Sequence, residues 1–447
     1  MFRTNAIYCG DCQRILRDFP EECVDLIYVD PPFFSNKQYE ILWGNGYELR
    51  SFEDRWQGDI LNYIAWMEPK IRESHRVLKD TGSIYLHCDW HANAHLRILM
   101  DKIFGENHFL NEIIWSRTHA HGGGEKGFSR IHDTLLFYVK SDSFRFNRQH
   151  VPYSAKYIKN FFRYVDKDGR RYRLVIATGS GETKSDYLWK GVRPTKGRHW
   201  AYTKEKMEEL DKQGKLVYSQ SGMPSVKQYI DEKKGTLVTD IWTDIEVIHS
   251  QSKERLGYPT QKPERLLDRI IKASSNPMDI VLDPMCGGGT TIAVAHKLGR
   301  RWIGIDVSPV ACKLMVERMR GLKIRITEGD IVGLPKTIEE IKALQPFEFQ
   351  NWVIQKMYAR ASLRRVGDMG VDGWTFDGNP IQIKQSEDVG RNVIDNFETA
   401  MRRANKKKGI IVAFSFGKGA YEEVARAKLE NGLEIELKKV EDIIKEI

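Results

Sequence analysis

The chain has 447 residues, 41% of them hydrophobic, which is enough apolar material for two or three domains with real cores. Its six cysteines are too sparse for a disulfide framework, and neither a signal peptide nor an apolar run of membrane-spanning length is present. Composition therefore excludes a disulfide-stapled secreted scaffold and a membrane-spanning protein, and we expect a cytoplasmic location.

The first predicted strand ends in a turn at Gly10-Asp11, and a helix is expected to start behind this turn at Cys12. Cys9 and Cys12 have the CxxC spacing of zinc sites. Because no second cysteine pair follows, we interpret the spacing as part of the strand-to-helix turn.

The second predicted strand, residues 24–29, ends at Asp30-Pro31-Pro32-Phe33. Its two prolines stop the strand and stiffen the turn. Such a turn suits an exocyclic amino group on a base, because the Asp30 carboxylate and the Pro31 carbonyl can accept its two hydrogens while Phe33 stacks on the ring. The amino nitrogen would then become nucleophilic without a strong base. The alternative is a simple strand terminator.

A buried strand is next predicted at residues 83–86, with a helix after it. The residues between them resemble a metal cluster at first sight, but we interpret them as a strand end and a helix start: His87, Cys88, Asp89, His91 and His95. The glycine cluster 122–124 predicts either a mobile loop beside a pocket or a plain surface turn. A further strand follows at residues 134–139.

The net charge of +9 is concentrated in the middle of the chain. Residues 145–198 contain 14 Lys and Arg against four Asp and Glu, a local excess of +10. Aromatic residues are interleaved with these cations, namely Tyr157, Phe161, Phe162, Tyr164, Tyr172, Tyr187 and Trp189. This combination suits phosphate neutralisation with base stacking, although a basic stretch can also be a solvated face.

Farther along, an apolar strand at residues 279–282 precedes a glycine-rich turn and a helix that starts at Thr290. The turn has neither the GxGxxG nor the GK[ST] pattern, so neither dinucleotide pyrophosphate binding nor a P-loop is its natural interpretation. About 20 residues on, a second apolar strand ends at Asp306, the position of the ribose-hydroxyl acceptor in a Rossmann-like site.

These motifs, in this order, resemble the beta class of amino-methylating DNA methyltransferases, which use S-adenosylmethionine. In that class the DPPF or DPPY motif comes first, a target-recognition region lies in the middle, and the glycine-rich cofactor motif comes late, a circularly permuted order. The resemblance covers about residues 1–330 and includes the stretch 258–264, which usually precedes the cofactor strand in this family.

The resemblance implies a role for each motif. The DPPF residues would be catalytic: Asp30, Pro31, Pro32 and Phe33. Asp306 would bind the cofactor's ribose, and the glycine-rich turn would shape its methionine side through Asp283, Met285, Cys286, Gly287, Gly289, Thr290 and Thr291. Met285 stands where family members often have Phe. Asp11 and Asp330 compete as the acid that contacts the cofactor's adenine, and we favour Asp11 because it ends the strand that directly precedes the DPPF strand.

The implied activity is site-specific transfer of a methyl group from S-adenosylmethionine to adenine N6 of a base flipped out of double-stranded DNA, within a restriction-modification system. Adenine is preferred because family members with DPPF or DPPY usually methylate adenine, whereas SPPY is commoner for cytosine N4. Cytosine-N4 methylation, an RNA substrate and a DNA-binding scaffold are the alternatives. A homodimer and a separate restriction subunit both stay open.

Beyond residue 335 the pattern resembles the PD-(D/E)xK nuclease core, in its Mrr-like branch, over about 110 residues. The resemblance implies that Glu348 and Asp372 help hold a divalent ion, with Mg²⁺ expected at Asp372. Gln382 would replace the usual second acid, and Lys384 would orient the attacking water. A DNA-gripping or dimerisation domain without cleavage is the alternative.

The expected fold class is therefore α/β. Residues 1–140 and 251–334 would form a Rossmann-like methyltransferase core with circularly permuted motif order. Residues 141–250 would form an inserted target-recognition region, and residues 335–447 an α/β/α restriction-endonuclease-like domain. In this last domain a first helix is expected from about residue 347 to residue 357, and strands are expected at 380–384 and 409–415.

Overall fold

The computed structural model describes residues 2–34, 38–41, 50–53, 59–117, 127–181, 185–249, 252, 254, 261–335, 337–344, 346–357, 359–361 and 370–445. The glycine cluster 122–124, residues 258–260 and the side chain of Glu348 lie outside this description. Two compact units are present, one formed by residues 148–239 and the other by the remainder of the chain.

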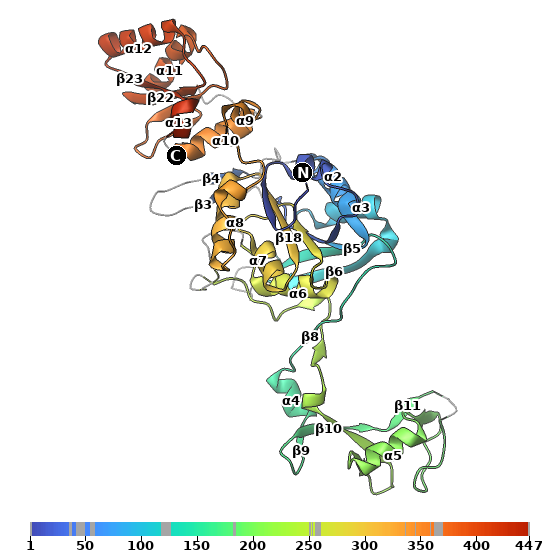
Figure 1. The fold of residues 1–447 in the computed structure, drawn as a ribbon. Helices are drawn as coiled ribbons and strands as arrows, with labels where there is room; N and C mark the ends of the chain where they lie inside the picture. The colour runs from blue at the N-terminus through green and yellow to red at the C-terminus, as the bar shows by residue number, and fades with distance from the viewer. Residues whose placement is uncertain are drawn as a thin grey trace. The chain divides into compact units, whose positions relative to one another are not determined.

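The larger unit contains an eight-stranded sheet with the order β1-β18-β17-β2-β5-β7-β6-β16 (Figure 1). Its strands are β1 (Ala6–Cys9), β2 (Val24–Val29), β5 (Leu78–Cys88), β6 (Phe109–Ser116), β7 (His132–Val139), β16 (Ile241–Trp242), β17 (Ile280–Asp283) and β18 (Arg301–Asp306). The pairs from β1 through β5 are parallel, whereas β7 is antiparallel to β5 and β6. The carboxyl ends of five parallel strands and the start of β7 therefore share one edge.

The central strands follow from their sequences. All residues of β2 and β17 are buried, and apart from Asp25 and the terminal Asp283 they are apolar rather than alternating, as expected for parallel strands covered on both faces. The helix α8 (Pro309–Gly321) starts where Ser308 accepts the Ala311 N–H, with Pro309 at its first position.

Helices cover both faces of the sheet (Figure 1). On one face α1 (Cys12–Arg17), α2 (Ile60–Val77) and α3 (Asn93–Phe104) share a hydrophobic core with the strands. On the other lie α6 (Glu264–Ser274), α7 (Thr290–Lys297) and α8, and Ser274 of α6 hydrogen-bonds Tyr85 of β5. Short elements complete this part: β3 (Gln38–Ile41), β4 (Arg50–Glu53), η1 (Glu106–His108) and η3 (Glu328–Asp330). The predicted Rossmann-like fold is confirmed.

The smaller unit has its own sheet, with the order β13-β14-β10-β9, and its own core around Trp189, Trp200 and Met207. Near its two ends β8 pairs with β15, which brings the entering and leaving chain segments side by side. Its elements are β8 (His150–Val151), α4 (Ala155–Phe161), β9 (Tyr164–Val165), β10 (Arg171–Ile176), β11 (Thr178–Ser180), β12 (Arg198–Trp200), α5 (Lys204–Lys212), β13 (Leu216–Tyr218), β14 (Pro224–Tyr229), η2 (Ile230–Glu232) and β15 (Thr236–Leu237).

The C-terminal part is a five-stranded sheet, β19-β20-β21-β22-β23, between two helical layers. Val412 of β22 packs with α10 and α13, whereas its neighbours Ile411 and Ala413 pack with α11 and α12. The predicted α/β/α sandwich is confirmed. Its elements are α9 (Ile338–Lys342), α10 (Pro346–Lys356), β19 (Arg360–Ala361), β20 (Gly373–Trp374), β21 (Pro380–Ile383), α11 (Arg391–Arg403), β22 (Lys408–Ala413), α12 (Lys418–Asn431), β23 (Glu434–Lys439) and α13 (Val440–Lys445).

Among the helices that the structure describes, none combines the length and the apolar character needed to cross a bilayer.

Candidate active site

Acidic side chains stand at the ends of five neighbouring parallel strands, at one edge of the large sheet. In sheet order they are Asp11, Asp306, Asp283, Asp30 and Asp89, after β1, β18, β17, β2 and β5. Open α/β sheets bind ligands at the carboxyl ends of their strands. The topology thus brings the predicted cofactor acids and the predicted catalytic acid to one edge, although they come from both ends of the chain.

The glycine-rich turn after β17 needs glycine at two positions. Gly287 and Gly289 have φ angles of 50° and 75°, which residues with a Cβ rarely adopt, and a Cβ on Gly289 would lie 3.0 Å from Met315 Cγ. The buried guanidinium of Arg318 holds the turn, donating to the Gly288 carbonyl at 3.1 Å and to Thr290 Oγ1 at 3.0 Å. The turn is therefore a fixed surface beside the strand ends.

Two buried carboxylates flank this turn. Asp283 accepts hydrogen bonds from Thr291 Oγ1 at 2.5 Å and from the Met285 N–H at 3.1 Å. Burial, reinforced by the charges of Asp30 and Asp306, raises the pKa of Asp283 to about 7.

Asp306 accepts the N–H groups of Gly287 and Ser308, both at 2.8 Å. Burial raises its pKa to about 6, against the effect of these two hydrogen bonds.

These carboxylates fit the cofactor that the sequence predicts. In the described residues, backbone N–H groups and a hydroxyl surround Asp283 and Asp306, and no Lys or Arg forms an ion pair with either. A buried carboxylate without a cation is unfavourable, and a ligand with a sulfonium and an ammonium group supplies the missing positive charge. Each carboxylate oxygen accepts more than one hydrogen bond, so Asp306 keeps lone pairs for a ribose hydroxyl.

Asp11, the predicted adenine-contacting acid, caps α1 by accepting the Arg14 N–H at 3.2 Å and lies 3.5 Å from Lys70 Nζ. The competing Asp330 accepts from the N–H and the hydroxyl of Thr327, both at 2.7 Å. Val332, two residues after Asp330, pairs with β1. Both acids therefore stand close to the carboxyl end of β1.

The Asp30 carboxylate of the DPPF turn is held by a lysine that the sequence did not single out. Lys262 donates to both carboxylate oxygens, at 2.8 and 2.6 Å, and its ammonium lies 4.9 Å from the centroid of the Phe33 ring. Both side chains are largely buried, Asp30 at 17% and Lys262 at 11% exposure. Asp30, Phe33 and Lys262 thus form one small polar pocket.

A buried hydrogen-bonded chain lies behind this pocket. The Tyr28 hydroxyl is 2.7 Å from His87 Nδ1, and His87 Nε2 is 3.3 Å from Asp133 Oδ2. Burial alone would raise the pKa of Asp133, but the His87 hydrogen bond and the charges of Arg117 and Lys262 hold it below its usual value. Because an ionised Asp133 only accepts, His87 Nε2 donates to it, and in the neutral imidazole Nδ1 accepts from Tyr28.

The His87 ring lies 5.7 Å from the Phe33 ring, so this chain supports the aromatic wall of the pocket. Sequence reasoning noticed His87 only as a member of a metal-like cluster, and it gave Tyr28, Asp133 and Lys262 no role. Each of these residues contacts a partner far away in the chain, and nothing in the local sequence indicates the pairing.

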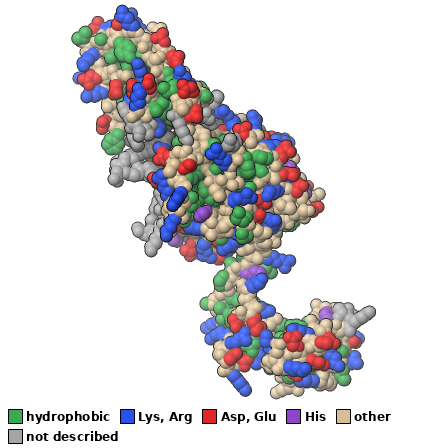
Figure 2. Space-filling model, viewed as in Figure 1, with side chains coloured by type: hydrophobic (Ala, Val, Ile, Leu, Met, Phe, Trp, Pro, Cys, Tyr) green, Lys and Arg blue, Asp and Glu red, His purple; other side chains and the backbone are tan. Residues whose placement is uncertain are grey.

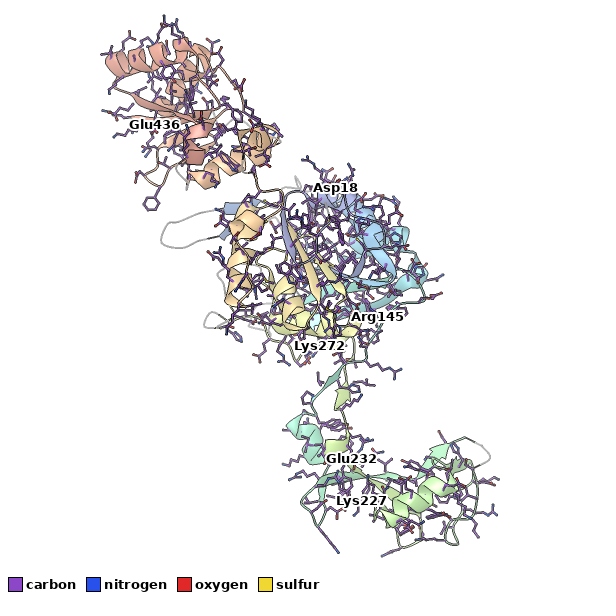
Figure 3. The ribbon with its side chains drawn as sticks, viewed as in Figure 1. Asp18, Arg145, Lys227, Glu232, Lys272 and Glu436 are labelled. Carbon is purple, nitrogen blue, oxygen red and sulfur yellow. The ribbon has the colours of Figure 1, made fainter. Side chains whose placement is uncertain are left out.

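The smaller unit uses part of its positive charge internally. Arg170 pairs with Asp231 and Glu232, and Lys227 pairs with Asp166 at 2.7 Å; Lys227 and Glu232 are labelled in Figure 3. The face drawn in Figure 2 shows Lys and Arg interspersed with Asp and Glu. These pairs neutralise single cations but leave the unit strongly positive, because residues 148–239 contain 20 Lys and Arg against 10 Asp and Glu.

Aromatic rings of the same unit remain accessible. Tyr157 stacks on Tyr153 at 4.9 Å and lies 4.5 Å from Phe161, and both Phe161 and Tyr164 are exposed. Exposed rings of this kind suit base or sugar contacts.

The predicted nuclease residues surround β21. The Asp372 carboxylate accepts the Ile383 N–H at 2.7 Å and contacts Gln350 Nε2 at 3.3 Å. Gln382 is buried, and its Oε1 has no hydrogen-bond partner in the described structure. Gln382 and Lys384, two residues apart near the end of one strand, share a face. Oxygen ligands are those that Mg²⁺ prefers, so Asp372 and Gln382 fit such an ion.

Residues 24–317 match the N6/N4 family model described as DNA methylase. Residues 341–447 match a second model, described as restriction endonuclease.

Two named relatives are type II methyltransferases. M.EcaI of Enterobacter cloacae is 33% identical over 297 residues, 66% of this chain and 64% of M.EcaI. M.HinfI of Haemophilus influenzae is 28% identical over 399 residues, 88% of this chain and 85% of M.HinfI. This chain thus spans just under two thirds of the length of M.EcaI.

Solved structures with a similar chain include PvuII DNA methyltransferase, described as cytosine-N4-specific, with a TM-score of 0.41 and 15% identity over 74% of this chain and 90% of that one. The M1.HpyAVI-SAM complex has a TM-score of 0.36 and 17% identity over 70% of this chain and 98% of that one. Since the DNA methylase model alone matches residues 24–317, more than half of the chain, the protein belongs to the N6/N4 DNA methylase family and carries a restriction endonuclease match at residues 341–447.

Proposed function

We propose that this protein transfers a methyl group from S-adenosylmethionine to the N6 amino group of an adenine flipped out of double-stranded DNA. The observation that carries the proposal is that Asp30 and Asp283 stand at the same edge of the sheet, at the carboxyl ends of the neighbouring strands β2 and β17. The family membership and the type II methyltransferase relatives support a role in a restriction-modification system.

The Asp30 turn activates the acceptor nitrogen. The carboxylate and the Pro31 carbonyl accept the two amino hydrogens, which draws the nitrogen lone pair out of conjugation with the ring. Because a carboxylate offers about four lone-pair sites, the amino group can bind beside Lys262. When the new N–C bond forms and the C–S bond breaks, the amino nitrogen releases one proton to Asp30 and from there to water. Phe33, backed by His87, stacks on the base.

The cofactor, when bound, supplies an electrophilic methyl group on a sulfonium. Asp283 and Asp306 hold its positive charge and its ribose, the turn through Gly287 and Gly289 lets it approach the backbone, and Asp11 contacts its adenine. Met285, Cys286, Thr290 and Thr291 complete this wall, and Cys286 and both threonines are buried.

The smaller unit, residues 148–239, reads the DNA sequence. It is a separate compact unit inserted between the two halves of the core, and its accessible aromatic rings and cations suit a polyanion with exposed bases. Its boundaries lie within the region 141–250 that the sequence analysis assigned to target recognition.

Substitution of Asp30 tests the catalytic assignment. Asp30→Ala should abolish methyl transfer while S-adenosylmethionine binding, measured by calorimetry, stays within about threefold of wild type, because Asp30 acts on the base. Asp18→Ala, which removes an exposed acid after α1 (labelled in Figure 3), is the control and should leave the activity unchanged. Full activity of Asp30→Ala would refute the mechanism.

A second activity is favoured by the restriction endonuclease match and by the buried, unpartnered Gln382 Oε1. We propose Mg²⁺-dependent DNA cleavage, with Asp372 and Gln382 as metal ligands, Glu348 as a third, and Lys384 orienting water. Double substitution Asp372→Ala with Lys384→Ala should abolish cleavage in magnesium and leave methylation intact. Unmethylated DNA left whole by the wild-type protein in magnesium would favour a domain that only grips DNA.

A further inference from the structure

Three exposed side chains lie on the segments that follow β5 and precede β7: Trp90, Phe128 and Arg130, here called the rim. Trp90 follows β5 by two residues and Arg130 precedes β7 by two. These strands pair with Cys88 opposite Thr134, and β5 also pairs with β2 next to Asp30. Both segments therefore leave the sheet at the edge that holds the DPPF turn.

The rim has a built geometry. The Arg130 guanidinium lies 3.5 Å from the centroid of the Trp90 ring, and the His91 ring lies 3.7 Å from the same ring. The carboxylate of the buried Asp89 holds His91 in place: it lies 2.7 Å from Nδ1 of the His91 ring and accepts the His91 backbone N–H at 3.1 Å. Trp90 remains 42% exposed.

Arg130 is exposed, and no carboxylate pairs with it in the parts of the chain that the structure describes. A guanidinium stacked on an indole keeps its N–H edge free for a planar or tetrahedral oxyanion. Phe128 is fully exposed to solvent, which is unfavourable for a large apolar ring unless a partner covers it.

One partner fits both features. Arg117 and Lys262, at the same edge, are paired with Asp133 and Asp30, so among these described side chains Arg130 is the cation available to a DNA phosphate. When one base is flipped out of a duplex, a gap is left between its stacked neighbours. DNA-binding proteins are known to insert apolar side chains between base pairs and so hold such a step open.

We propose that the rim binds the duplex at the target nucleotide, with Arg130 on a neighbouring phosphate and Phe128 filling the gap that the extruded base leaves. This inference rests on the proposed methyltransferase function and adds the residues that open the base pair. The rim would open the base pair, whereas Asp30 would take part in the methyl transfer.

The test of Phe128 compares two substrates. After the methylated sequence has been read from DNA modified by the wild-type protein, duplexes are made with the target base either paired or opposite a mismatch. Phe128→Ala should lower kcat/KM at least about tenfold on the paired duplex and less than about threefold on the mismatched one, because an unpaired base needs little help to leave the stack. Ile98→Ala, which removes an exposed side chain of α3, should change neither.

The test of Arg130 measures duplex affinity against salt concentration. Arg130→Ala should lower the slope of log K against log salt by about 0.9, the value for one phosphate contact. Arg72→Ala on α2, where Arg72 pairs with Glu68, is the control and should leave the slope unchanged.

An unchanged slope for Arg130→Ala overturns the proposal. So does a Phe128→Ala variant that matches wild type on both duplexes or loses equally on both. Wild-type protein that methylates no DNA in the first step would reject the proposed function itself, a result visible before any duplex is made.

Discussion

Single residues make cofactor binding depend on pH. Asp283 has a pKa of about 7, raised by burial and by neighbouring acids, so it takes up a proton as the pH falls through 7. A cationic cofactor binds the ionised carboxylate, and its affinity should therefore fall by up to about tenfold per pH unit below 7.

Asp283→Asn removes this titration. The variant should bind S-adenosylmethionine more weakly than wild type at pH 8, and its affinity should fall less than that of wild type between pH 7 and pH 6, measured by calorimetry. Asp306 and the ligand's own groups titrate in both experiments, so the difference isolates Asp283. The same pH dependence in variant and wild type would contradict the role of this carboxylate.

Lys262 orients Asp30, and its removal should affect turnover more than binding. Lys262→Met should lower kcat about ten- to hundredfold with cofactor affinity nearly unchanged, because the carboxylate loses the ammonium that fixes both of its oxygens. Lys262→Arg should recover part of the loss. The control Lys272→Met removes an exposed ion pair with Asp268 on α6 and should leave kcat and cofactor affinity unchanged. Steady-state kinetics that show equal losses for Lys262→Met and Lys272→Met would contradict the assignment.

At the scale of elements, α8 holds the cofactor turn through one buried side chain. Arg318 joins the Gly288 carbonyl, Thr290 Oγ1 and Glu264 of α6, so it links three segments around the site.

Arg318→Met should weaken cofactor binding about tenfold or more, because hydrogen bonds from a charged donor contribute about 1.5–3 kcal/mol each. DNA affinity should stay within about threefold. Arg320→Met, on the exposed side of the same helix, is the matched control. Equal cofactor affinity in both variants, measured by calorimetry, would show that the turn holds its shape without Arg318.

The strands that lead into the DPPF turn and to Asp306 were predictable from the sequence, because each apolar run and the acid after it are neighbours in the chain. The predicted strand 24–29 coincides with β2, and the strand predicted to end at Asp306 is β18. The pairings across the site were not predictable. Lys262 and Asp30 are 232 residues apart, and Tyr28 and His87 are 59 apart, so only the folded sheet brings them together.

The net positive charge of the middle region was predictable from the sequence, but its ion pairs were not. Arg170 pairs with Asp231 and Lys227 pairs with Asp166. Such pairs join distant parts of the unit, so a count along the chain cannot detect them.

At the level of the whole molecule, the smaller unit is a separate compact insertion whose two chain ends lie side by side, because the Val238 N–H donates to the Gln149 carbonyl at 3.0 Å. Replacing residues 150–237 by a short Gly-Ser linker should leave cofactor affinity within about threefold of wild type and abolish sequence-specific methylation. Calorimetry and sequencing of methylated positions measure the two effects. Methylation of the same sequence by the shortened protein would place recognition elsewhere.

Methyl transfer to an exocyclic amino group of a DNA base is the activity on which the other predictions depend. The most direct measurement incubates the purified protein with unmodified DNA and isotopically labelled S-adenosylmethionine without magnesium, and then identifies the labelled nucleosides by mass spectrometry after hydrolysis. We predict labelled N6-methyladenine. Labelled N4-methylcytosine would keep the mechanism at Asp30 and contradict the choice of base, and no labelled nucleoside from DNA would contradict the claim itself.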